Sequence, residues 1–267
     1  MKRSPLDPQY DFEVEQLNRA EFAGRDLLTV GSYNIHRCVG NDRRYDVERV
    51  ARVILELKCD TVGLQEVDSR PGLQTDSMQL EFLAQATGMQ PVAGTTFVLD
   101  GSLCANALLT TRKVGTIRRY DLTFKGREPR GALDVELHAG GQIVRVIVTH
   151  LGLRPAERRF QVKKLLTVLR GISPGQPVVV LGDINEWLPI GRPLRWLHRL
   201  LGRPPSQRSF PVWAPLFALD RVWSRPAGAL LALQVHRSAE ARAASDHFPV
   251  TAVVAPDVGR RSRHGME

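Results

Sequence analysis

Apolar runs alternate with amphipathic segments along most of the chain, and the spacing of the apolar positions predicts the elements. Short continuous or alternating apolar runs, bounded by polar or glycine-containing stretches, predict strands. They cover residues 27–35, 61–67, 105–110, 133–137, 143–150, 178–181, 219–223, 230–236 and 248–254. Apolar residues at three- and four-residue steps predict helices at 45–58, 77–87 and 155–170, and a short amphipathic segment at 194–201.

The order of these elements predicts one domain. Helices alternate with strands, and glycine-containing turns such as 139–141 favour antiparallel pairs in the middle of the chain. We expect an α/β (α+β) fold with two mostly antiparallel β-sheets packed face to face and helices outside them. Residues 1–26 are predicted to be a loosely docked lead-in, 27–255 the folded domain and 256–267 a basic tail.

Composition places the chain among globular proteins with anionic partners. It has 267 residues, 43% of them hydrophobic, and 37 Lys and Arg against 28 Asp and Glu give a net charge of +9. A basic body favours nucleic acid, acidic lipid surfaces or phosphoesters. The N-terminus lacks the apolar core of a signal peptide, and no window has the length and hydrophobicity of a membrane span. The three cysteines, Cys38, Cys59 and Cys104, have no metal-like spacing, which predicts a reducing, cytoplasmic location.

The most informative strand end lies at residues 177–185, PVVVLGDIN. Strand side chains alternate between faces, so Asp183 and Asn185 point the same way while Ile184 points into the core. Four other predicted strands also carry polar residues at an end, and a sixth short motif lies in a late loop. These residues are Asn34, His36, Glu66, His150 and Asp220, followed by Asp246 and His247. Each alone has an ordinary interpretation as a cap, a turn or a local ion pair.

Together these side chains fit a divalent-ion phosphoesterase. Mg²⁺ or Mn²⁺ takes hard oxygen ligands, which Glu66, Asp246 and the Asn34 amide would supply. Hydrolysis by water requires a base and neutralisation of charge on the phosphoryl oxygens. The base is either Asp183 or His247, the latter paired with Asp220. Asn185 and His150 would then donate hydrogen bonds to the phosphoryl oxygens.

Six ordered motifs resemble those of the endonuclease/exonuclease/phosphatase superfamily. They are 32–36 (SYNIH), 64–67 (LQEV), 149–151 (THL), 182–185 (GDIN), 219–222 (LDRV) and 245–249 (SDHFP). The resemblance covers about residues 27–255 and implies a four-layered sandwich of two sheets flanked by helices. It also implies the following site: Asn34 and Glu66 at the metal with Asp246 nearby, His150 at the phosphate, Asp183 and Asn185 at the nucleophile and transition state, and Asp220 orienting His247.

Further segments resemble small stand-alone bacterial members of that superfamily. They are 130–133, 149–158 and 210–222. Arg130 is either a phosphate ligand or a solvated charge at a strand entry. His150 sets the chain apart from abasic-site nucleases, which usually carry Asn there, and is more similar to the deoxyribonuclease, sphingomyelinase and phosphatase branches.

The substrate is the open question. A basic insert follows the GDIN strand, with no acidic residue at 192–208. It contains Arg192, Arg195, Arg199, Arg203 and Arg208, with Trp196, His198 and Trp213 nearby. The insert is interpreted as a nucleic-acid surface, a peripheral contact with anionic membrane, or a solvated loop with its tryptophans in the core. We expect a nuclease. The alternatives are a phospholipid or sphingomyelin-type phosphodiesterase, a small-molecule phosphatase, and a catalytically silent nucleic-acid-binding module.

Overall fold

The computed structural model describes residues 26–69, 78–94, 97–99 and 102–259 and contains two sheets. The first has the order β11 (Leu230–Val235), β12 (Val250–Val254), β1 (Leu28–Asn34), β2 (Thr61–Ser69), β5 (Ser102–Thr110) and β3 (Gln90–Ala93), and β4 (Phe97–Leu99) also pairs with β5. The second has the order β10 (Asp220–Arg225), β9 (Val178–Asp183), β8 (Gln142–His150), β7 (Gly131–Ala139) and β6 (Val114–Asp121). The expected two-sheet fold is confirmed.

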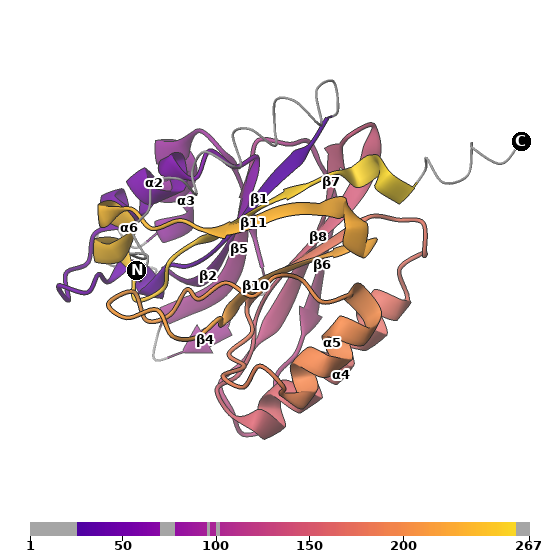
Figure 1. Cartoon of the computed structure of the whole chain (residues 1–267). Helices are drawn as coiled ribbons and strands as arrows, with labels where there is room; N and C mark the ends of the chain where they lie inside the picture. The colour runs from indigo at the N-terminus through magenta and orange to yellow at the C-terminus, as the bar shows by residue number, and fades with distance from the viewer. Residues whose placement is uncertain (1–25, 70–77, 95–96, 100–101, 260–267) are drawn as a thin grey trace, which may run out of the picture.

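Helices cover the outer face of each sheet (Figure 1). One outer layer contains α2 (Val47–Glu56), α3 (Gln79–Thr87) and α6 (Ala239–Ala244), and the other contains α4 (Pro155–Arg170) and α5 (Arg192–Leu201). A third apolar cluster, formed by inward-facing strand residues of both sheets, fills the space between them. The four-layered sandwich follows from these three cores, because each sheet has one apolar face toward the other sheet and one toward helices.

Most strand pairs are antiparallel, as expected, but each sheet contains one parallel pair. β1 pairs with β2 and β8 pairs with β9 in parallel, and the connections run through α2 and α4. A parallel pair needs such a crossover, and its two strands end at the same edge of the sheet. β10 is antiparallel to β9, with Asp220 opposite Asp183, and β12 is antiparallel to β1. The topology therefore brings several predicted polar strand ends to one edge.

The expected elements are present with small shifts at their ends. Asp46 caps α2 by accepting a hydrogen bond from the Arg49 amide (2.8 Å), and Gly88 ends α3 in a left-handed conformation. The segment 171–175 forms a turn between α4 and β9. Residues 1–25 of the predicted lead-in and 260–267 of the predicted tail lie outside the described residues. Pro256–Gly259 forms a 3₁₀ helix.

The sequence pattern missed β3, β4, β6 and α6. β3 is a four-residue strand with three exposed positions, and β6 is an edge strand in which exposed positions are interspersed with half-buried ones. Edge strands with little buried surface lack the apolar pattern that predicts a strand. α6 has six residues, too few for a helical period to be visible. Of the helices in the described ranges, none combines the length and the apolar character needed to cross a membrane.

Gly182 is required where β9 approaches the site. Its φ of +143° is a conformation that L-residues with a side chain rarely adopt, and a Cβ there would lie 1.8 Å from the Thr149 carbonyl oxygen of β8. That contact is with backbone and cannot be relieved by a side-chain rotation. The glycine thus lets Asp183 follow directly after a close approach of two parallel strands.

Replacing Gly182 by alanine will destabilise the protein and displace Asp183. We expect a loss of about 3 kcal/mol in the free energy of unfolding, measured by denaturant titration, because overpacking and backbone strain act together. Gly175→Ala is the matched control, since a Cβ there meets nothing within 4 Å. Equal stabilities of the two variants would contradict the explanation.

Candidate active site

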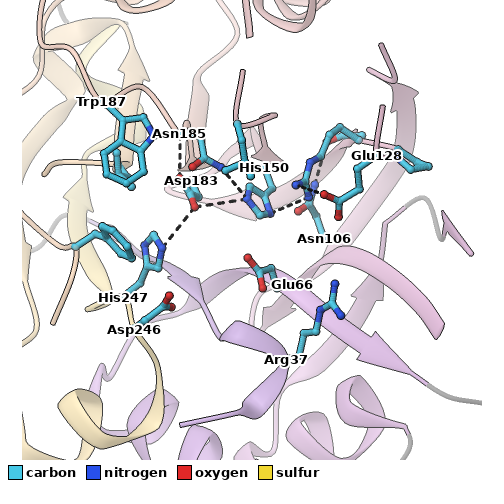
Figure 2. A pocket seen from close by; sticks show the side chains of 16 residues that line it. Arg37, Glu66, Asn106, Glu128, His150, Asp183, Asn185, Trp187, Asp246 and His247 are labelled. Atoms are coloured by element: carbon cyan, nitrogen blue, oxygen red, sulfur yellow. Dashed lines mark hydrogen bonds and ion pairs between the residues drawn. The ribbon is translucent and has the colours of Figure 1, made fainter. Parts of the chain in front are cut away.

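A cavity of about 270 Å³ lies at the edge where the strands end (Figure 2). It is lined by seven of the nine residues predicted for the site: Glu66, Arg130, His150, Asp183, Asn185, Asp246 and His247. The other two, Asn34 and Asp220, are almost fully buried and contact lining residues. The structure thus brings all nine predicted residues together.

Asp183 lies at the centre of this group. Its Oδ2 accepts a hydrogen bond from Asn34 Nδ2 (3.1 Å), and its Oδ1 accepts one from the backbone amide of Asn185 (2.9 Å). The same Oδ2 lies 3.5 Å from His150 Nε2 and 3.7 Å from His247 Nε2. Because Asn34 belongs to β1 and Asp183 to β9, this carboxylate joins the two sheets.

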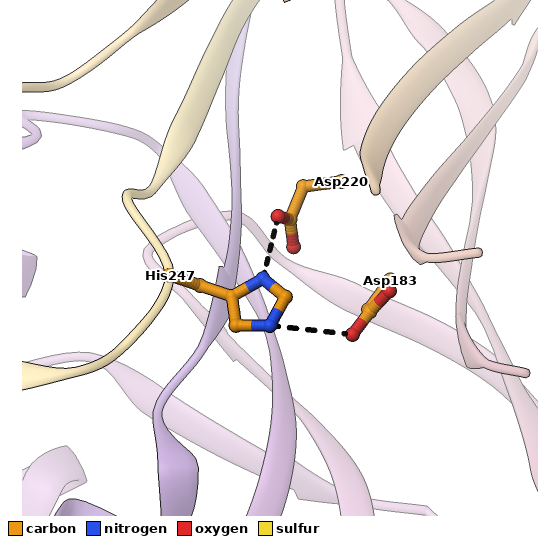
Figure 3. Close-up of side chains that lie close together, drawn as sticks. All are labelled: Asp183, Asp220 and His247. Carbon is orange, nitrogen blue, oxygen red and sulfur yellow. Dashed lines mark hydrogen bonds and ion pairs between the residues drawn. The ribbon is translucent and has the colours of Figure 1, made fainter. Parts of the chain in front are cut away.

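His247 is held by Asp220 (Figure 3). Its Nδ1 lies 2.8 Å from Asp220 Oδ2, which also accepts a hydrogen bond from Ser209 Oγ (2.5 Å). The other ring nitrogen faces Asp183, so the imidazole lies between two carboxylates. Such a pair fixes the orientation of the ring and stabilises its protonated form.

His150 is oriented by Asn185 and Arg130. Asn185 Nδ2 lies 3.0 Å from His150 Nε2 and also donates to the Leu151 carbonyl oxygen (2.9 Å). Arg130 Nη1 lies 3.3 Å from His150 Nδ1, and its Nη2 donates to Glu128 Oε2 (2.8 Å). Arg130 therefore lines the cavity as a partly neutralised cation beside the histidine.

Glu66 points into the cavity because β2 is irregular there. The pairing of β2 with β5 shifts register between Leu64 and Val67, and Glu66 has a φ of +59°. Figure 2 shows its carboxylate directed into the same space as Asp183 and His150. Asn34 Nδ2 donates to Glu66 Oε1 (3.1 Å), while Asn34 Oδ1 accepts from the His36 amide (3.0 Å). A bulge and a strained residue at a strand end thus aim a carboxylate at the site.

The donor set fits a hard divalent cation. Glu66 and Asp246 both line the cavity, and one or two carboxylates with retained waters are the usual ligands of protein-bound Mg²⁺. Ligand-type atoms of Asp183, Asp220 and His247 also lie within 4.8 Å of one another. That group is already joined by the His247–Asp220 contact, so Glu66 and Asp246 are the better candidates for holding an ion. In the present arrangement the Asn34 amide nitrogen bridges two carboxylates; its place as a ligand stays a prediction.

Burial and neighbouring charges shift the pKa values of three ionisable groups in the site. The pKa of Asp183 is raised to about 6, mainly by burial; the charge of His247 opposes this rise and that of Asp220 adds to it. Burial lowers the pKa of His247, but the charges of Asp220 and Asp183 outweigh it and raise the value to about 10. Burial lowers the pKa of His150 well below its usual value, and the charges of Arg130 and His247 act in the same direction. His150 is therefore neutral near pH 7, and His247 is protonated.

The structure adds site residues that the sequence pattern did not indicate. Arg37, Asn106, Trp187 and Phe210 line the cavity, and Ser209 holds Asp220. They come from loops or from the middle of a strand, where no change in periodicity marks them. Phe210 lies within the basic insert and Trp187 shortly before it, but their position at the cavity depends on loop geometry. Arg37, with φ +53°, follows the SYNIH motif directly.

The sandwich fold and the carboxylate, amide and imidazole groups at one of its edges define a class of hydrolytic phosphoesterases, typically dependent on a divalent metal. The Endonuclease/Exonuclease/phosphatase family model matches residues 31–247, and the chain belongs to this family. The resemblance drawn from six motifs is thereby confirmed.

Relatives cover most of the chain. It is 29% identical over 250 residues to the uncharacterized protein YbhP of Escherichia coli (strain K12), a match that covers 85% of this chain and 95% of that protein. The structure of an endonuclease/exonuclease/phosphatase from Beutenbergia cavernae has a TM-score of 0.71 at 24% identity, covering 87% of this chain and 72% of the other. D. rerio TDP2 complexed with single strand DNA product has a TM-score of 0.62 at 15% identity, covering 85% and 98%. The two structural matches show the same fold.

The protonated His247 will contribute stability that disappears at high pH. Its pKa is raised from 6.5 to about 10 in the folded state, so the contribution is fully present below pH 6.5 and is lost as the pH rises through about 10. The charges of Asp183 and Asp246 also act on the His247 ring, and the pKa of Asp183 is about 6 in the folded state. The stabilities of the wild type and of a His247 variant are therefore compared only above pH 6, where Asp183 is ionised. Thermal unfolding of the metal-free protein should show that the stability lost in His247→Gln shrinks between these limits. A constant difference would contradict the assignment.

Proposed function

We propose that this protein is a divalent-metal-dependent phosphodiesterase that hydrolyses its substrate by direct attack of water. The observation that carries the proposal is the cavity in which the Asp183 and His247 pair faces Glu66 and Asp246. A base, a cation and hard oxygen ligands within one small space are the groups that phosphoester hydrolysis requires. The ion would be Mg²⁺ or Mn²⁺.

Asp183 is the better candidate for the base. Its carboxylate borders the cavity, while His247 lies between Asp183 and Asp220 and is held as a cation. In this assignment Asp183 takes the proton of the attacking water. His247, oriented by Asp220, is a cation that stabilises the negative charge on a phosphoryl oxygen.

The remaining residues position the phosphate. Arg130 and His150 border the cavity together, and Asn185 holds His150 while it borders the cavity itself. Arg130 offers a guanidinium for a phosphate oxygen, and Asn185 and His150 offer hydrogen bonds to the phosphoryl group. A divalent ion held by Glu66 and Asp246, with Asn34 beside them, would neutralise phosphoryl charge and promote ionisation of a bound water.

Nucleic acid is one candidate substrate. The structure of a protein with this fold, D. rerio TDP2, is described as complexed with single strand DNA product, and the basic body of this chain suits a phosphate backbone. In the basic insert, Arg192, Arg195 and Arg199 are exposed on α5. Trp196 is half-buried under Lys163 Nζ, 5.6 Å from the ring centroid, and is less available for stacking on a base.

A phospholipid-type phosphodiester is the second candidate. Large apolar side chains are exposed around one side of the cavity, which a nucleic-acid groove does not require. A small-molecule phosphatase would use the same residues. A silent binding module is disfavoured because the carboxylates and imidazoles of the site form a connected network. We retain a cytoplasmic location as part of the proposal, supported by the free thiols of Cys38 and Cys59.

Removal of either central group will abolish most of the activity. His247→Ala and Asp183→Asn should each lower kcat by about 100- to 10,000-fold, because a proton acceptor or a stabilising cation is lost. Hydrolysis of bis(p-nitrophenyl) phosphate with Mg²⁺ or Mn²⁺ measures this, followed by a panel of oligonucleotides, phospholipids and phosphomonoesters. His236→Ala is the control, since His236 also pairs with a carboxylate, Glu56, but does not border the cavity. Unchanged rates in both site variants would contradict the proposal.

Glu66→Gln will weaken metal binding. The substitution keeps the shape and the Asn34 contact but removes a negative charge, so the dissociation constant for Mn²⁺, measured by titration calorimetry, should rise roughly tenfold or more. Glu136→Gln is the control, because Glu136 pairs with Arg118 on β6 and β7 and does not border the cavity. Equal Mn²⁺ affinities in the two variants would place the ion elsewhere.

A further inference from the structure

The most exposed large apolar side chains gather in three loops beside the cavity. Among the described residues, the five with the greatest exposure are Leu153 (62%), Leu188 (63%), Ile190 (79%), Trp213 (75%) and Leu216 (58%). We refer to these five as the apolar rim. They come from residues 151–156, 186–192 and 208–217, short segments of a chain whose other apolar side chains are mostly buried. Exposed apolar groups concentrated in this way mark an interaction surface.

Two of the loops are fixed to each other by a buried ion pair. Arg158 Nε donates to Glu186 Oε2 (3.2 Å), and both side chains are only 4% exposed. Arg158 Nη1 donates to the carbonyl oxygens of Gly152 and Leu153, while Glu186 Oε1 accepts from the Leu188 amide (3.2 Å). The pair therefore holds the backbone beside two rim residues, so their exposure is built into the fold.

Aromatic contacts join the third loop to the second. The Trp187 ring lies 5.6 Å from Phe210 and 4.8 Å from Phe217, measured between centroids. Phe210 and Phe217 face each other across the loop that carries Trp213 and Leu216, and the Leu216 amide donates to the Phe210 carbonyl oxygen (2.9 Å). Leu153, Trp187 and Phe210 also line the cavity. The three loops thus form one surface that adjoins the site.

The exposed charges of the three loops have one sign. Arg154, Arg192 and Arg208 are exposed, and the single acidic residue in these segments is the buried Glu186. Exposed arginines next to protruding Leu, Ile and Trp side chains complement a partner that has an apolar interior and a negatively charged outer face. A bilayer containing anionic phospholipids has this composition.

We propose that the apolar rim docks the protein on a bilayer containing anionic phospholipids. Leu and Ile enter the acyl boundary, Trp213 lies at the headgroup level, and the arginines contact lipid phosphates. Four of the five rim residues are aliphatic and have no ring to stack on a base. This inference rests on the proposed function for the reaction but deepens it by naming the substrate class, a phosphodiester presented at a membrane surface beside the cavity.

Vesicle binding tests the docking surface separately from hydrolysis. The full chain is mixed with phosphatidylglycerol/phosphatidylcholine vesicles and with phosphatidylcholine vesicles in EDTA, and binding is followed by co-sedimentation and tryptophan emission. The wild type should bind the anionic vesicles with a blue shift that Trp213→Phe largely removes. Leu188→Ser combined with Ile190→Ser should weaken binding about tenfold or more, because two aliphatic side chains no longer leave water.

The matched control is Leu55→Ser combined with Ile143→Ser. These residues are 52% and 43% exposed, on α2 and at the start of β8, the end of that strand opposite His150. The control should bind like the wild type, and Arg154→Gln with Arg192→Gln should bind anionic vesicles more weakly. Equal losses in the rim and control variants would overturn the inference.

Three other results would overturn the docking surface. They are no binding to anionic vesicles, rim variants that lose affinity for a single-stranded oligonucleotide but not for vesicles, and a wild-type dimer that the rim variants convert to a monomer. Failure of the proposed reaction looks different. If the protein binds vesicles through the rim but does not hydrolyse bis(p-nitrophenyl) phosphate, the docking surface stands and the proposed reaction fails. If it hydrolyses that diester with a metal ion but does not bind vesicles, the proposed reaction stands and the docking surface fails.

Discussion

The buried carboxylate of Asp183 is the interaction on which the site depends. It accepts hydrogen bonds from Asn34 of the first sheet and from the Asn185 amide, and the His150 and His247 imidazoles lie within 3.7 Å of it. A charge taken out of water persists only with such partners. The same contacts that compensate for its burial therefore also link the two sheets and hold His150 and His247 beside the carboxylate.

Topology explains why these partners meet. Each sheet contributes one parallel pair, and the carboxyl ends of parallel strands share an edge. At that edge the backbone departs from regular strand geometry: Glu66 and Asn185 have positive φ, and Gly182 allows a contact with β8 that a side chain would prevent. The strain is local because regular hydrogen bonding on both sides holds these residues in place. The sheets are regular except at these strand ends, so the irregular backbone is confined to the cavity and the apolar core is not disturbed.

The sequence was most informative where burial is complete. β9 is buried at every position, and its continuous apolar run predicts a strand ending at Asp183 without knowledge of its neighbours. Exposed edges such as β6 carry no such pattern, and the partners of a polar strand end cannot be read from one sequence. Asp220 illustrates both points: its position at a strand end was visible, whereas its contacts with His247 and Ser209 depend on segments 27 and 11 residues away. Arg37 and Trp187 were missed because loop geometry alone brings them to the cavity.

In the proposed function, chemistry and selection of substrate belong largely to different parts of the molecule. Asp183, His150 and Glu66 stand on strands or directly beside them, where packing of both sheets fixes them. Two of the three loops that carry the apolar rim are tied instead by Arg158 and Glu186 to one another and to α4, and Trp187 joins the third loop through Phe210 and Phe217. Because the five rim side chains are apolar and exposed, a substitution among them leaves the hydrogen bonds of the carboxylates and imidazoles in place. Since the loops are apolar and basic and the cavity presents carboxylates, imidazoles and a guanidinium, the substrate proposed above combines a phosphoryl group with an apolar part, which is the chemistry of a lipid headgroup at its boundary with the acyl chains.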